Sequence, residues 1–334
     1  MEKIRTIHYG VGYVGAEIAR LAASRPNIEI VACIDTDLVK AGRDLAEIIG
    51  AAQPTGMVIS SDAGAVLSST EADVVVHCTR SYLPQVVQQL SQIIEAGFDV
   101  VSTCEELSYP QLQYPDLADK LDTLARAHGV TVLGTGINPG FAMDKLPLAL
   151  TGVCQEVRSM RVTRVVDASR RRLPLQRRVG PGLSVEAFQE RVKDGTVCHV
   201  GLLESAALIA RGLGWELDDL SETTEPVVAD RVVSSEHFTV QPGQVRGVQQ
   251  VVRGLKRGRV VLVLELRMAL GEEDPHDAVV IEGTPPIDMV IQGGIHGDQA
   301  TAAVIVNSIS LVAAAGPGLV TVNDLPIARS LGVA

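Results

Sequence analysis

One short stretch near the start of the chain limits the fold more than any other, the glycine pattern Gly10-Val11-Gly12-Tyr13-Val14-Gly15. A β-prone run at 4–9 precedes it, and a run with helical apolar spacing at 16–22 follows it. Glycines at these spacings allow a tight turn, the approach of a pyrophosphate to the backbone, and close packing of helix on strand. The N–H groups at the start of the helix favour phosphate. We therefore predict that Gly10, Gly12, Tyr13, Val14 and Gly15 form a dinucleotide site.

The cofactor is indicated by the end of the second predicted strand, 28–34. It leads into Asp35 and Thr36, and Asp35 lies 20 residues beyond the last glycine of the pattern. A carboxylate there binds the ribose hydroxyls and disfavours a 2′-phosphate, so the pattern favours NAD. Lys40 and Arg43 follow closely and carry positive charge. Use of NADP as well is therefore compatible with the sequence.

Composition excludes several classes of partner. Hydrophobic residues make up 46% of the chain and aromatic residues only 3%, which suits a parallel sheet buried on both faces. The net charge of −11 argues against nucleic acid and anionic membrane as partners. The five cysteines form no C-x-x-C pair, so we expect neither disulfides nor a metal site. The first strand begins almost at the N-terminus, and we expect no signal peptide and a cytoplasmic protein.

Strand and helix patterns alternate through the first 150 residues, which is typical of a doubly wound parallel sheet. After the first two strands, we predict strands at 57–60, 73–78, 99–103 and 131–133 and helices at 62–67, 82–96 and 114–128. In such sheets, ligands bind beyond the carboxyl ends of the strands. The candidate site residues at these ends are Thr79, Ser81 and Glu105, with Gly136 and Asn138 in a glycine-rich loop at 134–140.

The pattern changes after about residue 155, where long alternating strands become common. We predict strands at 156–166, 227–233, 245–255 and 259–270, a hairpin turn at Lys256-Arg257-Gly258, and helices at 144–150, 185–194, 199–213 and 299–314. The expected fold is α/β, with a Rossmann domain at 1–150 and a mostly antiparallel α+β domain for substrate and dimerisation at 151–298. A C-terminal segment, 299–334, returns to the Rossmann domain. The antiparallel sheet favours a homodimer.

Four stretches give the chain a family resemblance: Cys104-Glu105-Glu106-Leu107-Ser108-Tyr109-Pro110, Gly134-Thr135-Gly136-Ile137-Asn138-Pro139-Gly140-Phe141, Val166-Asp167-Ala168-Ser169-Arg170-Arg171-Arg172-Leu173-Pro174, and His199-Val200-Gly201-Leu202 with Glu204-Ser205. With them the chain resembles the 2,4-diaminopentanoate dehydrogenases and the native amine dehydrogenases, within the wider dihydrodipicolinate reductase-like group. The resemblance implies reversible oxidative deamination, in which an amine and NAD(P)⁺ give a carbonyl, ammonia and NAD(P)H. It implies that Glu105, rather than its neighbour Glu106, is the catalytic carboxylate.

The chemistry explains why such a carboxylate is needed. Ammonia must lose a proton to attack a carbonyl, the carbinolamine hydroxyl must gain one to leave, and the iminium that results is cationic. Asn138 either holds nicotinamide or substrate or is a turn residue, and Thr79 either contacts the cofactor or caps a helix. His199 and Arg161 are candidates for substrate contacts, against a structural histidine and a solvated arginine. The arginines at 170–172 lie either near a ligand or on the surface.

Other functions are compatible with the same sequence. One is an imine reductase of the dihydrodipicolinate reductase-like group, although the Glu105-Glu106 pair argues against it. A second is a non-catalytic NAD-binding redox sensor. A third is a structural dimeric scaffold, which would leave the glycine pattern without a purpose. We expect the substrates to be a small amine, or a ketone, aldehyde or amino-oxo acid together with ammonia.

Overall fold

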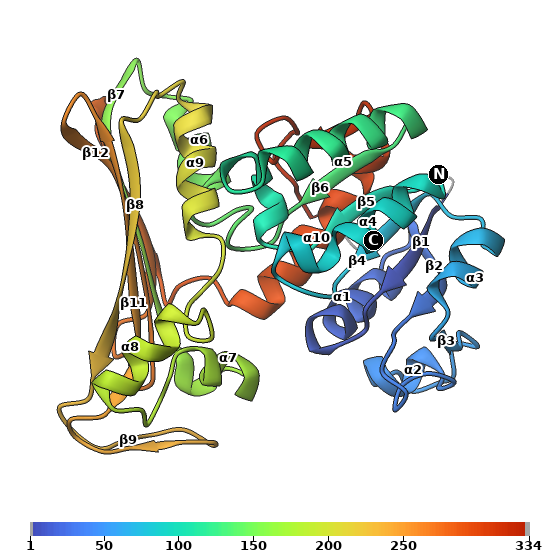
Figure 1. Cartoon of the computed structure of the whole chain (residues 1–334), viewed down its shortest axis with the longest axis horizontal. Helices are drawn as coiled ribbons and strands as arrows, with labels where there is room; N and C mark the ends of the chain where they lie inside the picture. The colour runs from blue at the N-terminus through green and yellow to red at the C-terminus, as the bar shows by residue number, and fades with distance from the viewer. Residues whose placement is uncertain (1–2, 331–334) are drawn as a thin grey trace. The chain divides into compact units, whose positions relative to one another are not determined.

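The computed structural model describes residues 3–330, which form two compact units (Figure 1). The described residues up to 141 and from 296 onward make up the first unit, and residues 142–295 make up the second. The first boundary was expected between residues 150 and 151, but it lies between 141 and 142, so helix α6 (Lys145–Thr151) belongs to the second unit. The return to the first unit was expected at residue 299 and occurs at 296. Between residues 3 and 330, no helix has both the length and the apolar character needed to cross a membrane.

The first unit is built on a parallel sheet with the strand order β15-β6-β5-β4-β1-β2-β3. The strands are β1 (Ile4–Tyr9), β2 (Ile28–Ile34), β3 (Ile59–Ser60), β4 (Val74–His77), β5 (Asp99–Ser102), β6 (Thr131–Gly134) and β15 (Gly318–Val320). The helices are α1 (Tyr13–Ala23), α2 (Leu45–Ile49), α3 (Ala63–Ser69), α4 (Leu83–Glu95), α5 (Pro115–His128) and α10 (Gly297–Ala313), with short 3₁₀ turns η1 (Glu106–Ser108) and η2 (Pro110–Leu112). This confirms the predicted doubly wound sheet.

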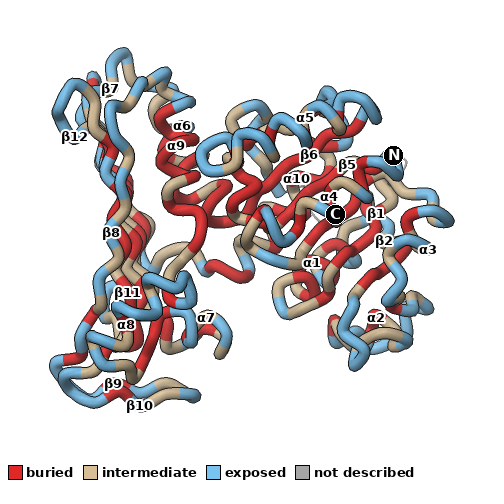
Figure 2. Tube along the Cα trace, in the orientation of Figure 1, coloured by how far each residue is buried: buried red, intermediate tan, exposed pale blue. Residues whose placement is uncertain are grey.

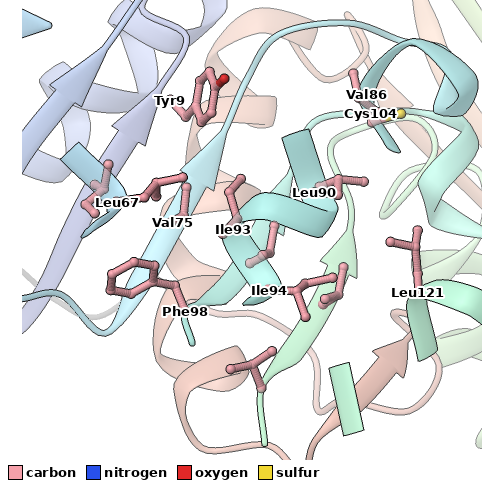
Figure 3. Packing of buried hydrophobic residues seen from close by; sticks show 14 of the residues in the cluster. Tyr9, Leu67, Val75, Val86, Leu90, Ile93, Ile94, Phe98, Cys104 and Leu121 are labelled. Atoms are coloured by element: carbon pink, nitrogen blue, oxygen red, sulfur yellow. The ribbon is translucent and has the colours of Figure 1, made fainter. Parts of the chain in front are cut away.

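Helices cover both faces of this sheet. Helices α1 and α10 pack on one face, and α4 and α5 pack on the other. Figure 3 shows the second interface, where the apolar side of α4, with Leu90, Ile93 and Ile94, meets Val75 and Leu121. Because both faces are buried, the strands are almost continuously apolar, and polar groups gather where the strands end.

The second unit has a six-stranded sheet with the order β14-β13-β7-β12-β11-β8, antiparallel except for the β7–β12 pair. Its strands are β7 (Glu156–Asp167), β8 (Asp219–Val228), β11 (Val245–Lys256), β12 (Arg259–Ala269), β13 (His276–Thr284) and β14 (Ile287–Gln292). Strands β9 (Val233–Ser234) and β10 (Thr239–Val240) form a separate two-stranded antiparallel ribbon. The helices are α6, α7 (Leu173–Arg178), α8 (Val185–Lys193) and α9 (Leu202–Gly212), with 3₁₀ turn η3 (Ala168–Arg170).

Only one face of this second sheet is covered. Helix α9, which is mostly buried (Figure 2), packs on β8, β11 and β12. Along β7 and β12, buried residues alternate with more exposed ones. We call the side beneath α9 the covered face and the opposite side the open face. Leu262, Leu264 and Leu266 of β12 are buried on the covered face, whereas Val263 and Glu265 on the open face are partly exposed. Alternation of this kind is expected for an antiparallel sheet with one buried side.

One strand prediction was wrong. The strand expected at 227–233 lies earlier, because β8 spans Asp219–Val228 and pairs with β11 through residues such as Thr223 and Glu225. Most residues of β8 are polar and few are large and apolar, so the alternation that predicts a strand is weak there. The hairpin at Lys256-Arg257-Gly258 is confirmed: Arg257 and Gly258 both have positive φ angles, as a tight turn between twisted strands requires.

Candidate active site

The glycine turn after β1 leaves no room for side chains at two of its positions. Gly10 has φ +93°, and a Cβ there would lie 2.4 Å from the carbonyl oxygen of Cys78. A Cβ at Gly15 would lie 2.0 Å from the carbonyl oxygen of Gly10, so α1 packs directly on the turn. At Gly12 a Cβ would meet no atom within 4 Å, which leaves this part of the backbone approachable. The three glycines therefore have the distinct roles that a pyrophosphate-binding turn needs.

Helix α1 begins directly after this turn. Its N-cap is Gly12, which offers no side-chain cap, and its first turn contains no acidic residue. The first helical residue, Tyr13, is 55% exposed, and Val14 is partly exposed. A helix start of this kind presents backbone N–H groups and the positive end of the helix dipole to an anion. The residues present fit the diphosphate of a dinucleotide.

Asp35, at the end of β2, is held as a carboxylate beside the glycine turn. Its Oδ2 accepts a hydrogen bond from Val11 N–H (2.9 Å) and pairs with Lys40 Nζ (2.9 Å), and its Oδ1 accepts from Asp37 N–H (2.9 Å). Burial alone would raise the pKa of Asp35, but these hydrogen bonds bring the pKa below its usual value. The next residue, Thr36, is exposed. Asp35 is thus fixed where a ribose-binding carboxylate is expected.

The two glutamates after β5 have different environments. Glu105 precedes the 3₁₀ turn η1 and is partly exposed, and its carbonyl oxygen accepts from Ser108 Oγ (2.7 Å). Glu106 is buried, and its carboxylate accepts hydrogen bonds from Leu83 N–H (2.6 Å) and Tyr114 Oη (3.3 Å). Burial raises the pKa of Glu106, although these two donors oppose the effect. Glu106 therefore caps the start of α4, and Glu105 is the more accessible of the pair.

Thr79, after β4, lies beside the glycine turn but does not cap a helix. Its Cγ2 would be 3.2 Å from a Cβ placed at Gly10. Its hydroxyl donates to Gln89 Oε1 (2.8 Å) and lies 2.9 Å from His77 Nε2. The N-cap of α4 is Tyr82, so the capping alternative for Thr79 is wrong. Ser81, two residues on, accepts through its carbonyl oxygen from Glu106 N–H (3.3 Å).

The loop at 134–140 is buried throughout and held within the first unit. Thr135 N–H donates to the carbonyl oxygen of Ser102 (2.9 Å), and Ile137 N–H donates to Thr301 Oγ1 (3.4 Å) of α10. Gly140 has φ +127°, and a Cβ there would lie 2.4 Å from the nitrogen of Gly136. Asn138 is 6% exposed. The loop thus follows β6 directly at the sheet edge where β1, β4 and β5 also end.

His199 is a partly exposed residue that lies just before helix α9 in the second unit. Gln250 fixes its backbone, since His199 N–H donates to Gln250 Oε1 (2.7 Å) and Gln250 Nε2 donates to the carbonyl oxygen of His199 (3.0 Å). Its ring Nδ1 has no hydrogen-bond partner within residues 3–330. Burial, with the nearby charges of Arg178, Arg164 and Arg171, lowers the pKa of His199 to about 3. The ring is therefore neutral at pH 7.

Arg161 and His199 lie on opposite faces of the second sheet, so one small substrate cannot contact both. Arg161 is on the open face, 51% exposed, and pairs with Glu265 (2.8 Å). Arg164, three residues on, is on the covered face with Gln250 and His199. It is 4% exposed, donates to Asp277 Oδ1 (2.6 Å), and donates to the carbonyl oxygen of Ile295 (2.7 Å). Of the two alternatives for Arg161, the solvated arginine agrees with this exposure, and Arg164 is the arginine of this strand whose charge acts on His199.

The arginines at 170–172 do not act as one cluster. Arg170 is exposed, Arg171 is buried and Arg172 is partly exposed. Of these, only Arg171 is among the charges that act on His199. Within the described part of the chain, no group of three or more His, Cys, Asp and Glu side chains is arranged to hold a metal ion.

Within the first unit, one sheet edge therefore brings together most of the predicted residues. We call it the carboxyl edge, since β1, β2, β4, β5 and β6 all end there, and it carries the glycine turn, Asp35, Thr79, Glu105 and the 134–140 loop. Sequence analysis missed His77, which accompanies Thr79, and Arg164 beneath α9. A buried arginine among apolar neighbours at every second position of β7 was the available signal for Arg164.

Comparisons with known proteins identify the relatives of both units. Residues 141–333 match the 2,4-diaminopentanoate dehydrogenase C-terminal domain, and residues 10–134 match the NAD-binding domain of homoserine dehydrogenase. The chain is 34% identical to the 2,4-diaminopentanoate dehydrogenase of Acetoanaerobium sticklandii, over 99% of this chain and 96% of the relative. It is 26% identical to an amine dehydrogenase of Streptomyces virginiae, over 98% of each.

A solved structure of an amine dehydrogenase is also similar to this chain. The amine dehydrogenase from Mycobacterium smegmatis is 28% identical and superposes with a TM-score of 0.87, over 98% of this chain and 97% of that one. The fold is thus shared over nearly the whole of both chains. The chain belongs to the family of 2,4-diaminopentanoate dehydrogenases and amine dehydrogenases, which are oxidoreductases.

Proposed function

We propose that this chain catalyses the reversible reaction of a primary amine, NAD⁺ and water to give a carbonyl compound, ammonia, NADH and a proton, with Glu105 as acid and base. The observation that carries the proposal is the partly exposed carboxylate of Glu105 on the same sheet edge as the glycine turn and Asp35. A redox sensor would have no need for an acid-base group there. The amine dehydrogenase relatives support the same reaction class.

Bound NAD⁺ supplies the hydride acceptor, and the residues of this chain do the rest. The glycine turn and the start of α1 bind the diphosphate, and Asp35 binds the ribose hydroxyls. Gly136 and Asn138, in the loop after β6, border the nicotinamide. As hydride leaves the amine carbon, Glu105 stabilises the iminium by its negative charge. It then takes one proton from the attacking water and returns it to the nitrogen, which leaves as ammonia. The second water proton leaves the hydroxyl as the carbonyl forms, and it is the proton that the reaction releases.

We further propose that the substrate carries a carboxylate in addition to the reacting amine. His199 is neutral, and the charges of Arg178, Arg164 and Arg171 act on it. Arg164 is paired with Asp277, so the charges of Arg178 and Arg171 are the ones that favour an anionic ligand group over an apolar one. A diamino acid or an amino-oxo acid fits this environment better than a simple alkylamine. The first-mentioned relative bears the name of such a diamino acid.

The remaining proposals concern assembly and cofactor range. On the open face of the second sheet, one row of paired residues across the strands consists of Val251, Glu265, Thr163, Ala278 and Val290. Val290 is 47% exposed, which is unusual for a large apolar side chain on a sheet. We propose that a second copy of the chain covers this face, giving a homodimer. We also propose that NADP is accepted less well than NAD and that the protein is cytoplasmic.

A substrate screen tests the reaction and the substrate class together. The purified chain is mixed with NAD⁺ and either 2,4-diaminopentanoate or alkylamines of matched length, and NADH is followed by absorbance. We expect turnover with the diamino acid at roughly 10-fold or greater advantage in kcat/KM, because a charge-assisted contact is lost in the alkylamines. Turnover of alkylamines alone would contradict the carboxylate proposal. Absence of turnover with every amine, despite NADH binding, would contradict the enzymatic proposal and favour a sensor.

A further inference from the structure

A fully buried histidine lies at the centre of a hydrogen-bond network under the carboxyl edge. His77 is the last residue of β4 and has no exposed surface. Its Nδ1 lies 2.8 Å from Ser102 Oγ, and its Nε2 lies 2.9 Å from Gln89 Oε1 and 2.9 Å from Thr79 Oγ1. Ser102 Oγ in turn accepts from Cys104 N–H (3.1 Å). We call these five residues the His77 network.

The partners of the ring determine its protonation. Burial, opposed by the hydrogen bond to Gln89, lowers the pKa of His77 to about 4, so the ring is neutral at pH 7. With Gln89 Oε1 as acceptor, the proton is on Nε2, and Ser102 Oγ donates to Nδ1. Every polar atom of the ring then has a partner. A neutral ring whose hydrogen bonds are all made inside the protein is suited to holding its neighbours in place.

The network joins two turns that carry candidate site residues. One arm ends at Thr79, beside the glycine turn that binds the cofactor. The other arm runs through Ser102 to the backbone of Cys104, the residue directly before Glu105. Gln89 of helix α4 contacts both His77 and Thr79, so the helix is tied to the ring itself and to the first arm. These contacts all lie within the first unit.

We propose that His77 is a positioning residue, which fixes the cofactor-side turn at Thr79 and the carboxylate-bearing turn at Glu105 in one geometry. The inference rests on the proposed role of Glu105. Misplacement of a reacting group by about 1 Å costs on the order of 100-fold in rate, so a network that sets this spacing is expected to affect the reaction. The two arms act on different parameters, one on cofactor binding and one on turnover.

Two small substitutions separate the arms. Ser102→Ala removes the Nδ1 partner and the acceptor for Cys104 N–H, and Thr79→Val removes the hydroxyl while it keeps the side-chain shape. We expect Ser102→Ala to lower kcat roughly 10- to 100-fold and to leave the NADH Kd within about twofold. We expect Thr79→Val to raise the NADH Kd roughly 2- to 10-fold, the worth of one hydrogen bond, with a smaller effect on kcat.

The matched control is His8, in the neighbouring strand β1. It is also fully buried, with a pKa lowered by burial to about 4, and its Nε2 has no hydrogen-bond partner within residues 3–330. His8→Leu and His77→Leu therefore remove similar rings from adjacent strands. We expect His77→Leu to change both kcat and the NADH Kd, and to move the acid limb of the kcat–pH profile. We expect His8→Leu to change none of these.

The measurements are NADH fluorescence titration, steady-state kinetics from pH 5 to 9, and thermal melting, all on the full chain. If Ser102→Ala and Thr79→Val lower Tm but leave kcat and Kd unchanged, His77 is merely structural and the inference is wrong. It is equally wrong if both variants change the same parameter to the same extent. Should His77→Leu not fold, these two variants carry the test. Full activity of Glu105→Gln would overturn the proposed function, whereas the Thr79 arm is still measured by NADH binding without turnover.

Discussion

The two sheets of this molecule use burial in different ways. The first is covered by helices on both faces, so its interior strands are apolar and its polar side chains are concentrated at the carboxyl edge. The second is covered on one face only, so polar and charged side chains occur along the whole length of its strands. In the first sheet the position of a residue along the strand decides its role. In the second sheet the decisive property is which face it occupies.

Two residue pairs show this difference. Glu105 and Glu106 are neighbours at the edge of the first sheet, and one is accessible while the other caps a helix. Arg161 and Arg164 lie three residues apart on one strand of the second sheet, and one is solvated while the other is buried in an ion pair. In the first sheet, a shift of one residue along the chain changes the environment of a glutamate. In the second sheet, the face of the sheet decides the environment of an arginine.

The largest effect is expected at the edge of the first sheet. Glu105→Gln keeps the size of the side chain but removes its charge and its capacity as a base. We expect kcat to fall roughly 10²- to 10⁴-fold, the usual contribution of a positioned acid-base group, with an unchanged NADH Kd. In Glu106→Gln the amide oxygen still accepts from Leu83 N–H, so we expect near-normal kcat and a small decrease in Tm. Steady-state kinetics and melting curves check both, and loss of activity in Glu106→Gln alone would reverse the assignment.

A comparably large effect is expected from the buried arginine of the second sheet. Arg164→Met leaves Asp277 as an unpaired buried carboxylate, and the lost pair also held the carbonyl oxygen of Ile295. We expect the free energy of unfolding to fall by about 3–5 kcal/mol. Arg161→Met breaks an exposed pair and is expected to cost about 0–1 kcal/mol. Urea denaturation of the two variants measures the contrast, and equal losses would show that the face of the sheet does not matter.

Acid should destabilise the fold through its buried histidines. His8 has a pKa of about 4 in the folded chain against 6.5 when unfolded, so the unfolded state binds more protons between these values. The stability that the neutral ring contributes is complete above pH 6.5 and is lost as the pH falls toward 4, by about 1.4 kcal/mol per pH unit. His8→Leu should remove this pH-dependent contribution to the free energy of unfolding. Urea midpoints at pH 7 and pH 5 test it, and an unchanged pH slope in the variant would contradict the neutral buried ring.

The open face of the second sheet should respond to charge in a different way. Ala278→Glu places a second carboxylate in the row that we propose to be covered by a second copy, with Thr163 between it and Glu265. We expect self-association to weaken by roughly 10- to 100-fold without loss of the monomer fold. Val153→Glu, at a position that is 70% exposed, is the control and should leave assembly unchanged. Light scattering at micromolar concentration gives the result, and a monomeric unmodified chain would disprove the dimer.

The smallest effect concerns cofactor choice. Asp35→Ala removes the carboxylate that holds Val11 N–H and Lys40 and that is proposed to bind the ribose. We expect the Kd for NADH to rise about 10-fold, and that for NADPH to change less because Lys40 is released to meet a 2′-phosphate. Fluorescence titration with both cofactors measures the ratio. Tighter binding of NADPH than NADH by the unmodified chain would contradict the preference.

Much of the first unit could be predicted from sequence because its signals are local. The glycine pattern, the apolar runs and the residues that follow them are neighbours in the chain, and strand ends in a parallel sheet meet at one edge. The His77 network was not foreseen. It joins strand ends to a helix twelve residues further on, and only the register of β4 against β5 places His77 beside Ser102.

In the second unit, sequence predicted elements better than roles. The alternation in β7 was visible, but it does not say which face α9 will cover, so it did not single out Arg164 as the buried arginine of this strand. Strand β8 was misplaced because its partner β11 is distant in sequence and its own residues are polar. Pairing and helix placement are long-range properties, and a single sequence contains them only indirectly.

The order of segments along the chain has a consequence for biosynthesis. Helix α10 and strand β15 complete the first unit, yet they are encoded after the whole of the second. A nascent polypeptide emerging from the ribosome therefore exposes the apolar face between α1 and β5 until residue 296 and beyond have been translated. The second unit is contiguous and is free to fold earlier. The cofactor-binding half, although it begins first, is the last part of this enzyme to mature.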